Sequence, residues 1–235
     1  MDNQSYYDEF AAGYERERHH GYHKLIDALE LGFIRRHAAG GRILEAGCGT
    51  GLLLREVAHF ARQAVGFDLS RGMLGPAHAR GLGIVQAAVT QVPFADASFD
   101  AVYSVKVLAH VEPIREALAE LARVTRPGGT LVLEFYNTRS LRTLIKRLKP
   151  ATKISARTSD DAVYTRYDSI ADVRGYLPPG CQIVDVRGVR VLTPVAAVHR
   201  VPGLSRVMRA AEAFAADAPG LRGLGGFLLV AARKL

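Results

Sequence analysis

The sequence has few of the residues that cross-link small domains. It contains two cysteines, Cys48 and Cys181, and no tryptophan among its 235 residues. Two thiols are too few for a disulfide framework or for a zinc site built on thiolates. Cys48 also falls within a glycine-rich turn, where a disulfide would be awkward. We therefore expect a reduced, cytoplasmic protein that holds no metal ion.

Long hydrophobic runs are also missing. No stretch reaches the roughly 18 uninterrupted apolar residues that a membrane span requires. The first ten residues, MDNQSYYDEF, are acidic and have no apolar core, so we expect no secretory signal. Hydrophobic residues make up 49% of the chain and charged residues 23%, which predicts one globular domain with a single sizeable core.

Acidic residues are too few to balance the basic ones, and the formal net charge is +8. Such a charge suits nucleic acid, an anionic membrane surface or a phosphorylated substrate, and it equally suits solubility alone. The chain has no appended RNA-binding module and few aromatic residues among its basic ones. We therefore expect no nucleic acid partner.

Short apolar runs alternate along the chain with stretches of helical periodicity. Ile114, Leu118 and Leu121 recur at helical spacing in one stretch, where Pro113 suits the first turn. Strands that alternate with helices predict a parallel sheet with helices on both faces. The predicted strands are 42–47, 64–69, 83–88, 99–105, 130–136 and, at one edge, 181–192 and 226–234; the predicted helices are 51–61, 70–81, 113–125 and an opening helix that contains Leu25, Ile26, Leu29 and Phe33.

The stretch ILEAGCGTGLLL, residues 43–54, places Gly47, Gly49 and Gly51 at alternate positions between two apolar runs. A dinucleotide-binding turn has the spacing G-x-G-x-x-G, and a phosphate-binding loop ends in G-K-S/T, so neither pattern fits. Asp68 ends the next predicted strand about 20 residues later, where a carboxylate can accept hydrogen bonds from ribose hydroxyls. The turn therefore predicts a nucleotide-like ligand that approaches the backbone too closely for side chains.

Four ordered motifs, EAGCGTG, GFDLSRGML, VPFADASFDAVYSVKVLAHV and RPGGTLVLEF, together resemble class I S-adenosylmethionine-dependent methyltransferases, in the broad group that includes the ubiquinone and menaquinone biosynthesis enzymes. The resemblance is close over residues 40–137 and loose on the flanks. It implies an α/β fold with a Rossmann-like, doubly wound, seven-stranded and mostly parallel sheet whose last strand is antiparallel. It also implies S-adenosylmethionine as cofactor and S-adenosylhomocysteine as product. The acceptor stays open, because this fold is reused with different sites.

The resemblance also assigns roles to cofactor-binding residues. Asp68 would hold the ribose, Val89 would offer its backbone to the adenine edge, and Ser104 would lie near the methionine amine. The acidic residue that often follows the third strand in the family is replaced here by Ala88, so adenine recognition would depend on backbone and packing. The implied cofactor-binding residues are Tyr14, Glu45, Ala46, Gly47, Gly49, Gly51, Asp68, Leu69, Met73, Val89, Ser104 and Val105.

Each of these motifs has a purely structural interpretation as well. The glycines could form a tight turn only, Asp68 could cap a helix and Glu45 could anchor the turn. Pro93 and Phe94 favour packing over contact with a ligand. The order and spacing of the four motifs favour the cofactor site for the glycines and Asp68.

His110 is the predicted general base. Methyl transfer from a sulfonium is an in-line displacement, and a hydroxyl acceptor must also lose its proton, for which histidine is suited near neutral pH. The alternative is a histidine that packs beside the cofactor. Ala109 stands where relatives often carry a glutamate, so no carboxylate acts there. Tyr136 and Asn137 end the fifth predicted strand at the carboxyl edge of the sheet, where we predict contact with the substrate.

The N-terminal region is rich in tyrosine and histidine. The three tyrosines of YYDEFAAGYE, residues 6–15, resemble the aromatic lid of many relatives, and a ring near the sulfonium would add about a kcal/mol. They could equally anchor the first helix to the core. His19, His20 and His23 lack the glutamate of an HExxH metal motif, so a solvated face is favoured over a metal site.

We predict that two regions outside the core decide the acceptor. Residues 139–153 have a basic amphipathic pattern that suits peripheral membrane contact or a lipid-linked or phosphorylated substrate, and also a solvated cap helix. Residues 199–225 are predicted to be helical and to roof the acceptor pocket, with His199 as a second candidate base. The predicted division is 1–39 for N-terminal lid helices, 40–137 for the cofactor-binding core, and 138–180 and 194–225 for cap insertions of a single domain.

The sequence thus predicts S-adenosylmethionine-dependent methyl transfer to a small-molecule or lipid-like acceptor, with a hydroxyl oxygen favoured because His110 is available. Carbon or nitrogen methylation, a non-catalytic S-adenosylmethionine-binding partner protein and an RNA methyltransferase are the alternatives. The complete glycine turn and Asp68 argue against loss of catalysis, and the glycine spacing argues against a dinucleotide oxidoreductase. The oligomeric state is not predicted.

Overall fold

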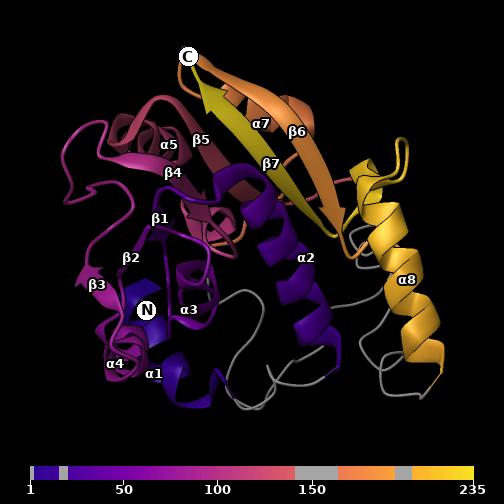
Figure 1. Cartoon of the computed structure of the whole chain (residues 1–235), viewed down its shortest axis with the longest axis horizontal. Coiled ribbons are helices and arrows are strands. Elements are labelled where there is room, and N and C mark those ends of the chain that lie inside the picture. Colours follow the sequence, from indigo (N-terminus) through magenta and orange to yellow (C-terminus); the bar gives the residue numbers. More distant parts are fainter. Residues whose placement is uncertain (1–2, 16–20, 141–163, 194–202) are drawn as a thin grey trace.

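A seven-stranded sheet forms the centre of the molecule. The computed structural model describes residues 3–15, 21–140, 164–193 and 203–235. The strands lie in the order β3 (Gly83–Gln86), β2 (Gln63–Asp68), β1 (Arg42–Ala46), β4 (Phe99–Ser104), β5 (Thr125–Tyr136), β7 (Phe227–Lys234) and β6 (Cys181–Val189) (Figure 1). β1 to β5 pair in parallel, and β7 runs antiparallel to both of its neighbours. The predicted sheet with an antiparallel last strand is confirmed.

The strand order reverses at the centre of this sheet. β1 pairs with β2 on one side and with β4 on the other, so the chain crosses over between β3 and β4. In open α/β sheets, ligands bind at such a reversal, outside the carboxyl ends of the strands. The glycine turn follows β1 directly, and it therefore lies at the position where this architecture places a site.

Helices cover both faces of the sheet, because successive strand residues point to opposite sides. Ile43 packs with one apolar cluster and Leu44 with the other. The first cluster contains residues of α2 (Gly21–Ala38), α3 (Leu52–Ala58) and α8 (Leu204–Asp217), and the second contains residues of α5 (Ile114–Val124) and α7 (Ile170–Tyr176). At the β3 side, α4 (Arg71–Ala79) packs against β3 and α1 (Asn3–Phe10) packs against α4. The described residues also form the 3-10 turns η1 (Ala11–Gly13), η2 (Leu108–His110) and η4 (Arg222–Leu224).

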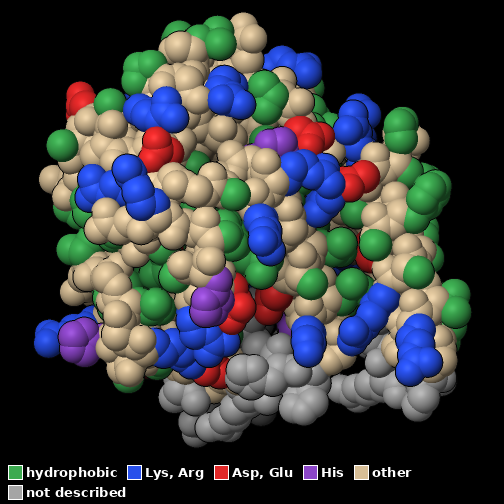
Figure 2. All heavy atoms as spheres, in the orientation of Figure 1, with side chains coloured by type: hydrophobic (Ala, Val, Ile, Leu, Met, Phe, Trp, Pro, Cys, Tyr) green, Lys and Arg blue, Asp and Glu red, His purple; other side chains and the backbone are tan. Residues whose placement is uncertain are grey.

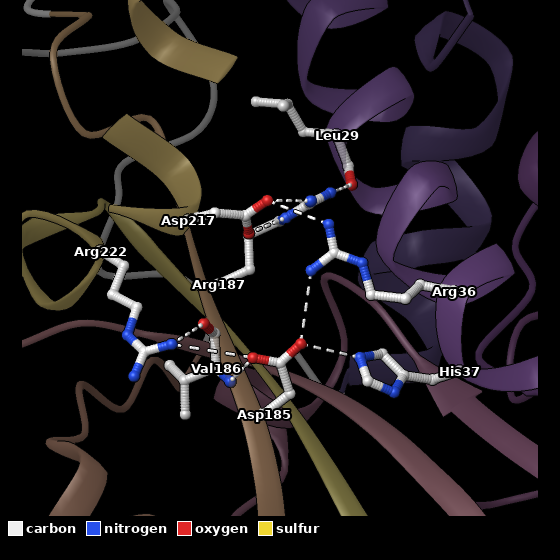
Figure 3. Close-up of polar contacts among 8 residues, drawn as sticks. All are labelled: Leu29, Arg36, His37, Asp185, Val186, Arg187, Asp217 and Arg222. Carbon is white, nitrogen blue, oxygen red and sulfur yellow. Dashed lines mark hydrogen bonds and ion pairs between the residues drawn. The ribbon is translucent and has the colours of Figure 1, made fainter. Parts of the chain in front are cut away.

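A network of charged groups fixes α8 and β6 to α2 (Figure 3). Arg187 of β6 donates to both oxygens of Asp217 at 2.8 and 2.6 Å, and to the Leu29 carbonyl at 3.0 Å. Arg36 of α2 donates to Asp217 at 3.0 Å and also reaches Asp185 of β6. Three elements that are distant in sequence thus meet around two carboxylates.

Two elements differ most from the sequence-based expectation. β5 begins at Thr125, five residues before the predicted strand 130–136, because Thr125 already pairs with Phe99 of β4 ahead of a register shift. α7 was not predicted; it begins with a reciprocal capping pair between Ser169 and Asp172.

Within the described ranges, no helix is long and apolar enough to cross a membrane. Residues 141–153 of the predicted basic helix lie outside those ranges, and so do His19, His20 and His199.

Candidate functional site

The glycine turn after β1 is built from backbone in the left-handed region. Gly47, Gly49 and Gly51 have φ angles of 78°, 52° and 79°, which glycine adopts at little cost. A Cβ on Gly47 would collide with Val107 and one on Gly51 with Leu82, whereas a Cβ on Gly49 would meet nothing within 4 Å. Packing therefore explains two of the glycines, while Gly49 faces open space.

Asp68 lies beside this turn at the end of β2. Its Oδ2 accepts a hydrogen bond from the Gly49 amide at 2.8 Å, and its Oδ1 accepts one from the Ser70 amide at 2.9 Å. Burial raises the pKa of the Asp68 carboxyl, although both amides favour its ionised form. The residue that caps α4 is Ser70, which accepts from the Met73 amide. Asp68 therefore has lone pairs left for further donors such as hydroxyls.

A cavity of about 890 Å³ extends along the carboxyl edge of the sheet, from the glycine turn to the end of β5. This volume suits a nucleoside-sized cofactor together with a small acceptor. Of the fourteen predicted site residues, those that line it are Tyr14, Gly47, Gly49, Asp68, Leu69, Met73, Val89, Val105, His110 and Tyr136; Glu45, Ala46, Gly51 and Ser104 do not. The structure thus brings most of the predicted residues to one cavity.

Glu45 and Ser104 lie behind the turn, inside the sheet. Ser104 donates to the Ala46 carbonyl at 2.9 Å, and Tyr103 donates to Glu45 Oε2 at 2.8 Å. Burial raises the pKa of Glu45 to about 8, while the Tyr103 hydrogen bond opposes the shift. Glu45 borders a smaller cavity of about 400 Å³ that shares Gly47 with the larger one. The geometry supports the interpretation of Glu45 as an anchor of the turn.

His110 lies at the other end of the large cavity. Its Nδ1 is 3.0 Å from the Tyr164 carbonyl and 3.3 Å from the Thr165 hydroxyl, and its Nε2 is 3.4 Å from the Tyr136 hydroxyl. A carbonyl only accepts, so the neutral ring carries its proton on Nδ1 and a lone pair on Nε2. Burial lowers the pKa of His110, which favours that neutral form.

The N-terminal helix α1 closes one side of the cavity. Tyr6 and Tyr7 both line it, and the Tyr7 ring lies 6.4 Å from the His110 ring. Burial raises the pKa of the Tyr7 hydroxyl well above its usual range. Asp8 holds α1 in place, because its Oδ1 accepts from the Ser70 hydroxyl and from the Gly72 amide. The sequence analysis identified the tyrosines but not this anchoring role of Asp8.

Lys106 is a cavity residue that the sequence analysis missed. It follows β4 with a φ of 63°, in the region that side chains rarely adopt. Its Nζ donates to Asp27 at 3.0 Å and to Glu30 at 2.7 Å, and its amide donates to Glu134 at 3.1 Å. Burial and the neighbouring Glu30 raise the pKa of Glu134 well above its usual range. In the sequence, only Glu134 inside the apolar stretch LVLEFY could have indicated this buried cluster of charged groups, because charged side chains are rarely buried without partners.

Arg190 is a second residue that was missed. It follows β6, has a φ of 61° and lines the cavity. Its guanidinium lies 5.0 Å from the centre of the Tyr22 ring, and its carbonyl accepts from the Gly226 amide at 3.0 Å. Phe227 follows Gly226 in the chain, and the centre of its ring lies 5.1 Å from the centre of the Tyr136 ring. A cation therefore lies in the aromatic wall at the acceptor end.

Other predicted substrate-side groups lie elsewhere. Asn137 is buried and donates to the carbonyls of Gly223 and Gly225, at 2.8 Å each. No residue of α8 is among those that line the cavity, so the described helix of the segment 194–225 does not form its wall. His23 does line the cavity. In the part of the chain that the structure describes, no group of three or more histidine, cysteine or acidic side chains could hold a metal ion.

Comparison with known proteins agrees with this geometry. Residues 44–133 match the family of methyltransferase domains. The chain is 40% identical over 129 residues to a demethylmenaquinone methyltransferase of Beutenbergia cavernae, covering 50% of this chain and 54% of that protein. It is 36% identical over 113 residues to the O-methyltransferase resE of Aspergillus sclerotiorum, covering 44% and 43%. The chain therefore spans about half the length of these curated relatives.

Solved structures resemble the fold over nearly the whole chain. An S-adenosylmethionine-dependent methyltransferase of Thermotoga maritima superposes with a TM-score of 0.71 at 19% identity, covering 97% of this chain and 98% of that one. The [4+2]-cyclase SpnF superposes with a TM-score of 0.67 at 22% identity, covering 98% and 95%. At these identities the likeness shows the fold alone.

Residues 44–133 are thus similar to methyltransferase domains, and the sheet around them has the fold of S-adenosylmethionine-dependent methyltransferases. Several similar proteins, those of Beutenbergia cavernae and Mycobacterium marinum among them, are demethylmenaquinone methyltransferases, which agrees with the resemblance drawn from the motifs.

The residues that line the large cavity fit S-adenosylmethionine as the cofactor. Gly49 leaves its Cβ position open toward the cavity, and the Asp68 carboxylate beside it has lone pairs for ribose hydroxyls. Leu69, Met73 and Val89 supply apolar surface further along the same wall.

Proposed function

We propose that this protein transfers a methyl group from S-adenosylmethionine to a small-molecule or lipid-like acceptor, with a hydroxyl oxygen as the favoured acceptor atom. The observation that carries the proposal is the single cavity that joins the glycine turn and Asp68 at one end to His110 and Tyr136 at the other. Its aromatic wall suits a flat apolar acceptor. The names of the two curated relatives, a demethylmenaquinone methyltransferase and an O-methyltransferase, support an acceptor of this kind.

In this proposal the twelve predicted cofactor-binding residues divide by position. Asp68 holds the ribose, and the backbone at Gly47 and Gly49 lies against the cofactor. Tyr14, Leu69, Met73, Val89 and Val105 line the cavity as further cofactor contacts. Glu45, Ala46, Gly51 and Ser104 support the turn from behind.

The protein's part in catalysis is alignment and proton removal. When bound, S-adenosylmethionine would supply an electrophilic methyl group; the aligned acceptor oxygen would bond to it in line as the bond to sulfur breaks, with S-adenosylhomocysteine as the leaving group. His110 Nε2 carries the lone pair of the neutral ring and lies 3.4 Å from the Tyr136 hydroxyl, so an acceptor hydroxyl would take over that contact and give its proton to Nε2. The Tyr164 carbonyl fixes the ring through Nδ1.

Two further candidates remain in the proposal. A carbon or nitrogen acceptor would use the same alignment and would need His110 less. The fold neighbour named as a [4+2]-cyclase illustrates that the fold does not determine the reaction. A non-catalytic S-adenosylmethionine-binding partner protein is therefore the alternative that the experiment must separate.

The first experiment measures thermal unfolding of the purified protein alone, with S-adenosylhomocysteine and with NAD. A ligand at about 100 times its dissociation constant adds nearly 3 kcal/mol to the stability of the folded state. We expect a clear upward shift of Tm with S-adenosylhomocysteine and none with NAD. Absence of the first shift would refute the cofactor site.

The second experiment screens phenolic and lipid-linked hydroxyl compounds for S-adenosylhomocysteine formation. We expect turnover with at least one hydroxyl acceptor, and loss of that turnover in the His110→Gln variant while S-adenosylhomocysteine still binds. Binding of S-adenosylhomocysteine without turnover of any acceptor class would favour the non-catalytic alternative.

A further inference from the structure

Helix α8 exposes an apolar stripe on its outer face. Leu204 is 44% exposed, Val207 65% and Phe214 73%. The spacing from Val207 to Phe214 is seven residues, or two helical turns, so both side chains point to the same side of the helix. Phe214 is the most exposed of the large hydrophobic side chains in the described residues. These three side chains therefore do not pack in the hydrophobic core of the domain.

The inner face of α8 already has its packing partners. Ala215 and Ala216 are fully buried against the domain. Glu212, also buried, accepts from the amides of Val191, Leu192 and Thr193. The helix is therefore fixed in one orientation, and its outer stripe is a rigid feature of the surface.

The charges beside the stripe are of one sign. Arg206 is exposed on α8, about 100° around the helix axis from Val207, whereas the exposed Arg209 lies further round, on the side away from the stripe. Both acidic residues of α8 are engaged from within, because Glu212 binds the chain after β6 and Asp217 pairs with Arg187 and Arg36. In Figure 2, hydrophobic side chains follow the outer edge of the molecule over α8, with Lys and Arg groups beside them. The outward face is thus apolar and cationic.

The geometry points to an anionic lipid membrane as the partner of this surface, which we call the α8 face (Leu204, Arg206, Val207 and Phe214). Amphipathic helices with aromatic and aliphatic residues beside arginines insert their apolar side at the acyl boundary, while the arginines reach the phosphates. The chain's net charge of +8 adds attraction to an anionic leaflet.

A protein partner fits the α8 face less well. A stable protein interface buries about 800 Å² on each side, and a helix of 14 residues is only about 21 Å long. α8 stands at the edge of the molecule as a convex ridge (Figure 1), so it would engage a flat protein with one row of side chains. A lipid surface needs no matching groove. This inference is independent of the proposed methyl transfer.

The test is co-sedimentation of the full chain with phosphatidylcholine vesicles, with and without one third phosphatidylserine. We expect binding to the phosphatidylserine vesicles that weakens as salt rises. The Val207→Ser/Phe214→Ser double variant should bind at least about tenfold more weakly, since it removes two apolar side chains from the inserted face. Arg206→Gln should weaken the preference for phosphatidylserine, whereas Arg209→Gln, on the other side of the helix, should change it less.

The matched control is Val184→Ser, which changes a valine that is 54% exposed on β6 and outside the α8 face. It should bind vesicles like the unchanged protein, and circular dichroism should show all variants folded. Failure of the unchanged protein to bind phosphatidylserine vesicles would overturn the inference. So would equal loss in the Val184 variant, or sedimentation velocity showing a dimer that Phe214→Ser dissociates, which would assign the face to a second copy.

Discussion

Gly49 and Gly51 have similar backbone conformations for different reasons. A Cβ on Gly49 would project into open space beside Asp68, whereas one on Gly51 would collide with Leu82 of the neighbouring layer. Both have positive φ angles, so an alanine at either position also carries backbone strain of about 1 kcal/mol. An added methyl group at Gly49 therefore tests ligand binding, and the same group at Gly51 tests packing.

We expect Gly49→Ala to weaken S-adenosylhomocysteine binding by at least about tenfold, because its methyl group occupies cofactor space, while unfolding stability falls by only about 1 kcal/mol. Gly51→Ala should instead lose about 2 kcal/mol or more through overpacking. Calorimetric titration and urea unfolding of both variants measure the two effects. Equal loss of affinity in the two variants at equal stability would contradict the assignment of Gly49.

His110 should determine the acidic limb of the pH–rate profile. Burial lowers its pKa, and only the neutral ring can accept a proton. For a hydroxyl acceptor, kcat/KM should therefore rise with pH to a plateau, with a midpoint below the usual pKa of histidine. His110→Gln should lower the plateau about 100-fold or more and remove the rise. An unchanged profile in that variant would assign His110 to packing beside the cofactor.

At the scale of secondary structure, Glu212 connects α8 to the wall of the cavity. Its carboxylate accepts from the amides of residues 191–193 and from the Thr193 hydroxyl at 3.0 Å. The preceding residue, Arg190, lines the cavity. Helix α8 contributes no residue to the wall of the cavity, but through Glu212 it fixes the loop that begins at Arg190.

We expect Glu212→Gln to lose about 2–3 kcal/mol of unfolding free energy, because an amide cannot accept from all of these donors and leaves buried amides unpaired. Limited proteolysis should then cut between β6 and α8 faster than in the unchanged protein. Arg209→Gln, an exposed change on the same helix, is the control and should stay within about 0.5 kcal/mol. A Glu212 variant as stable as this control would contradict the role.

The sequence was informative where structure is local and less so where it depends on long-range contacts. The runs RILEAG and FDAVYSV predicted β1 and β4 closely, because an apolar strand between turn residues is a local pattern. The site at the carboxyl edge followed from the glycine turn and Asp68. The start of β5 at Thr125 and the contacts of Lys106 depend on residues distant in the chain, which periodicity does not encode.

Within the site, the sequence pattern likewise did not distinguish Ser104 and Glu45, whose side chains lie inside the sheet, from Gly49, which lines the cavity. Their motifs matched the family equally well, yet Ser104 bonds to the Ala46 carbonyl and Glu45 to Tyr103, inside the sheet. A motif reports that a residue belongs to the turn, but the direction of its side chain depends on the pleat and on neighbouring strands.

For the whole molecule, the buried glutamates make stability depend on pH. The pKa of Glu45 is raised to about 8, so its protonated form is favoured in the folded state. A group with a raised pKa contributes stability at low pH that is lost as pH rises through the folded value. Glu134 acts in the same direction. We therefore expect the free energy of unfolding to fall between about pH 5 and pH 8.

Glu45→Gln should flatten this decline, since it removes one group that must ionise in a buried site. At most about 1.4 kcal/mol per pH unit comes from a single group. Urea unfolding at pH 5, 6.5 and 8 should show that the free energy of unfolding of the variant rises relative to that of the unchanged protein as pH rises. Glu116→Gln, an exposed change on α5, is the control. A parallel decline in the Glu45 variant would contradict ionisation at this residue.

The placement of β7 between β5 and β6 has a consequence for biosynthesis. β6 precedes β7 in the chain but pairs with it and with no other described strand. On the ribosome, β6 must therefore wait unpaired while α8 and η4 are made, for a few seconds at ordinary translation rates. During that interval, the edge of β5 that β7 will cover is also open. This newly made sheet is the state in which chaperone binding or misassembly would act on the protein.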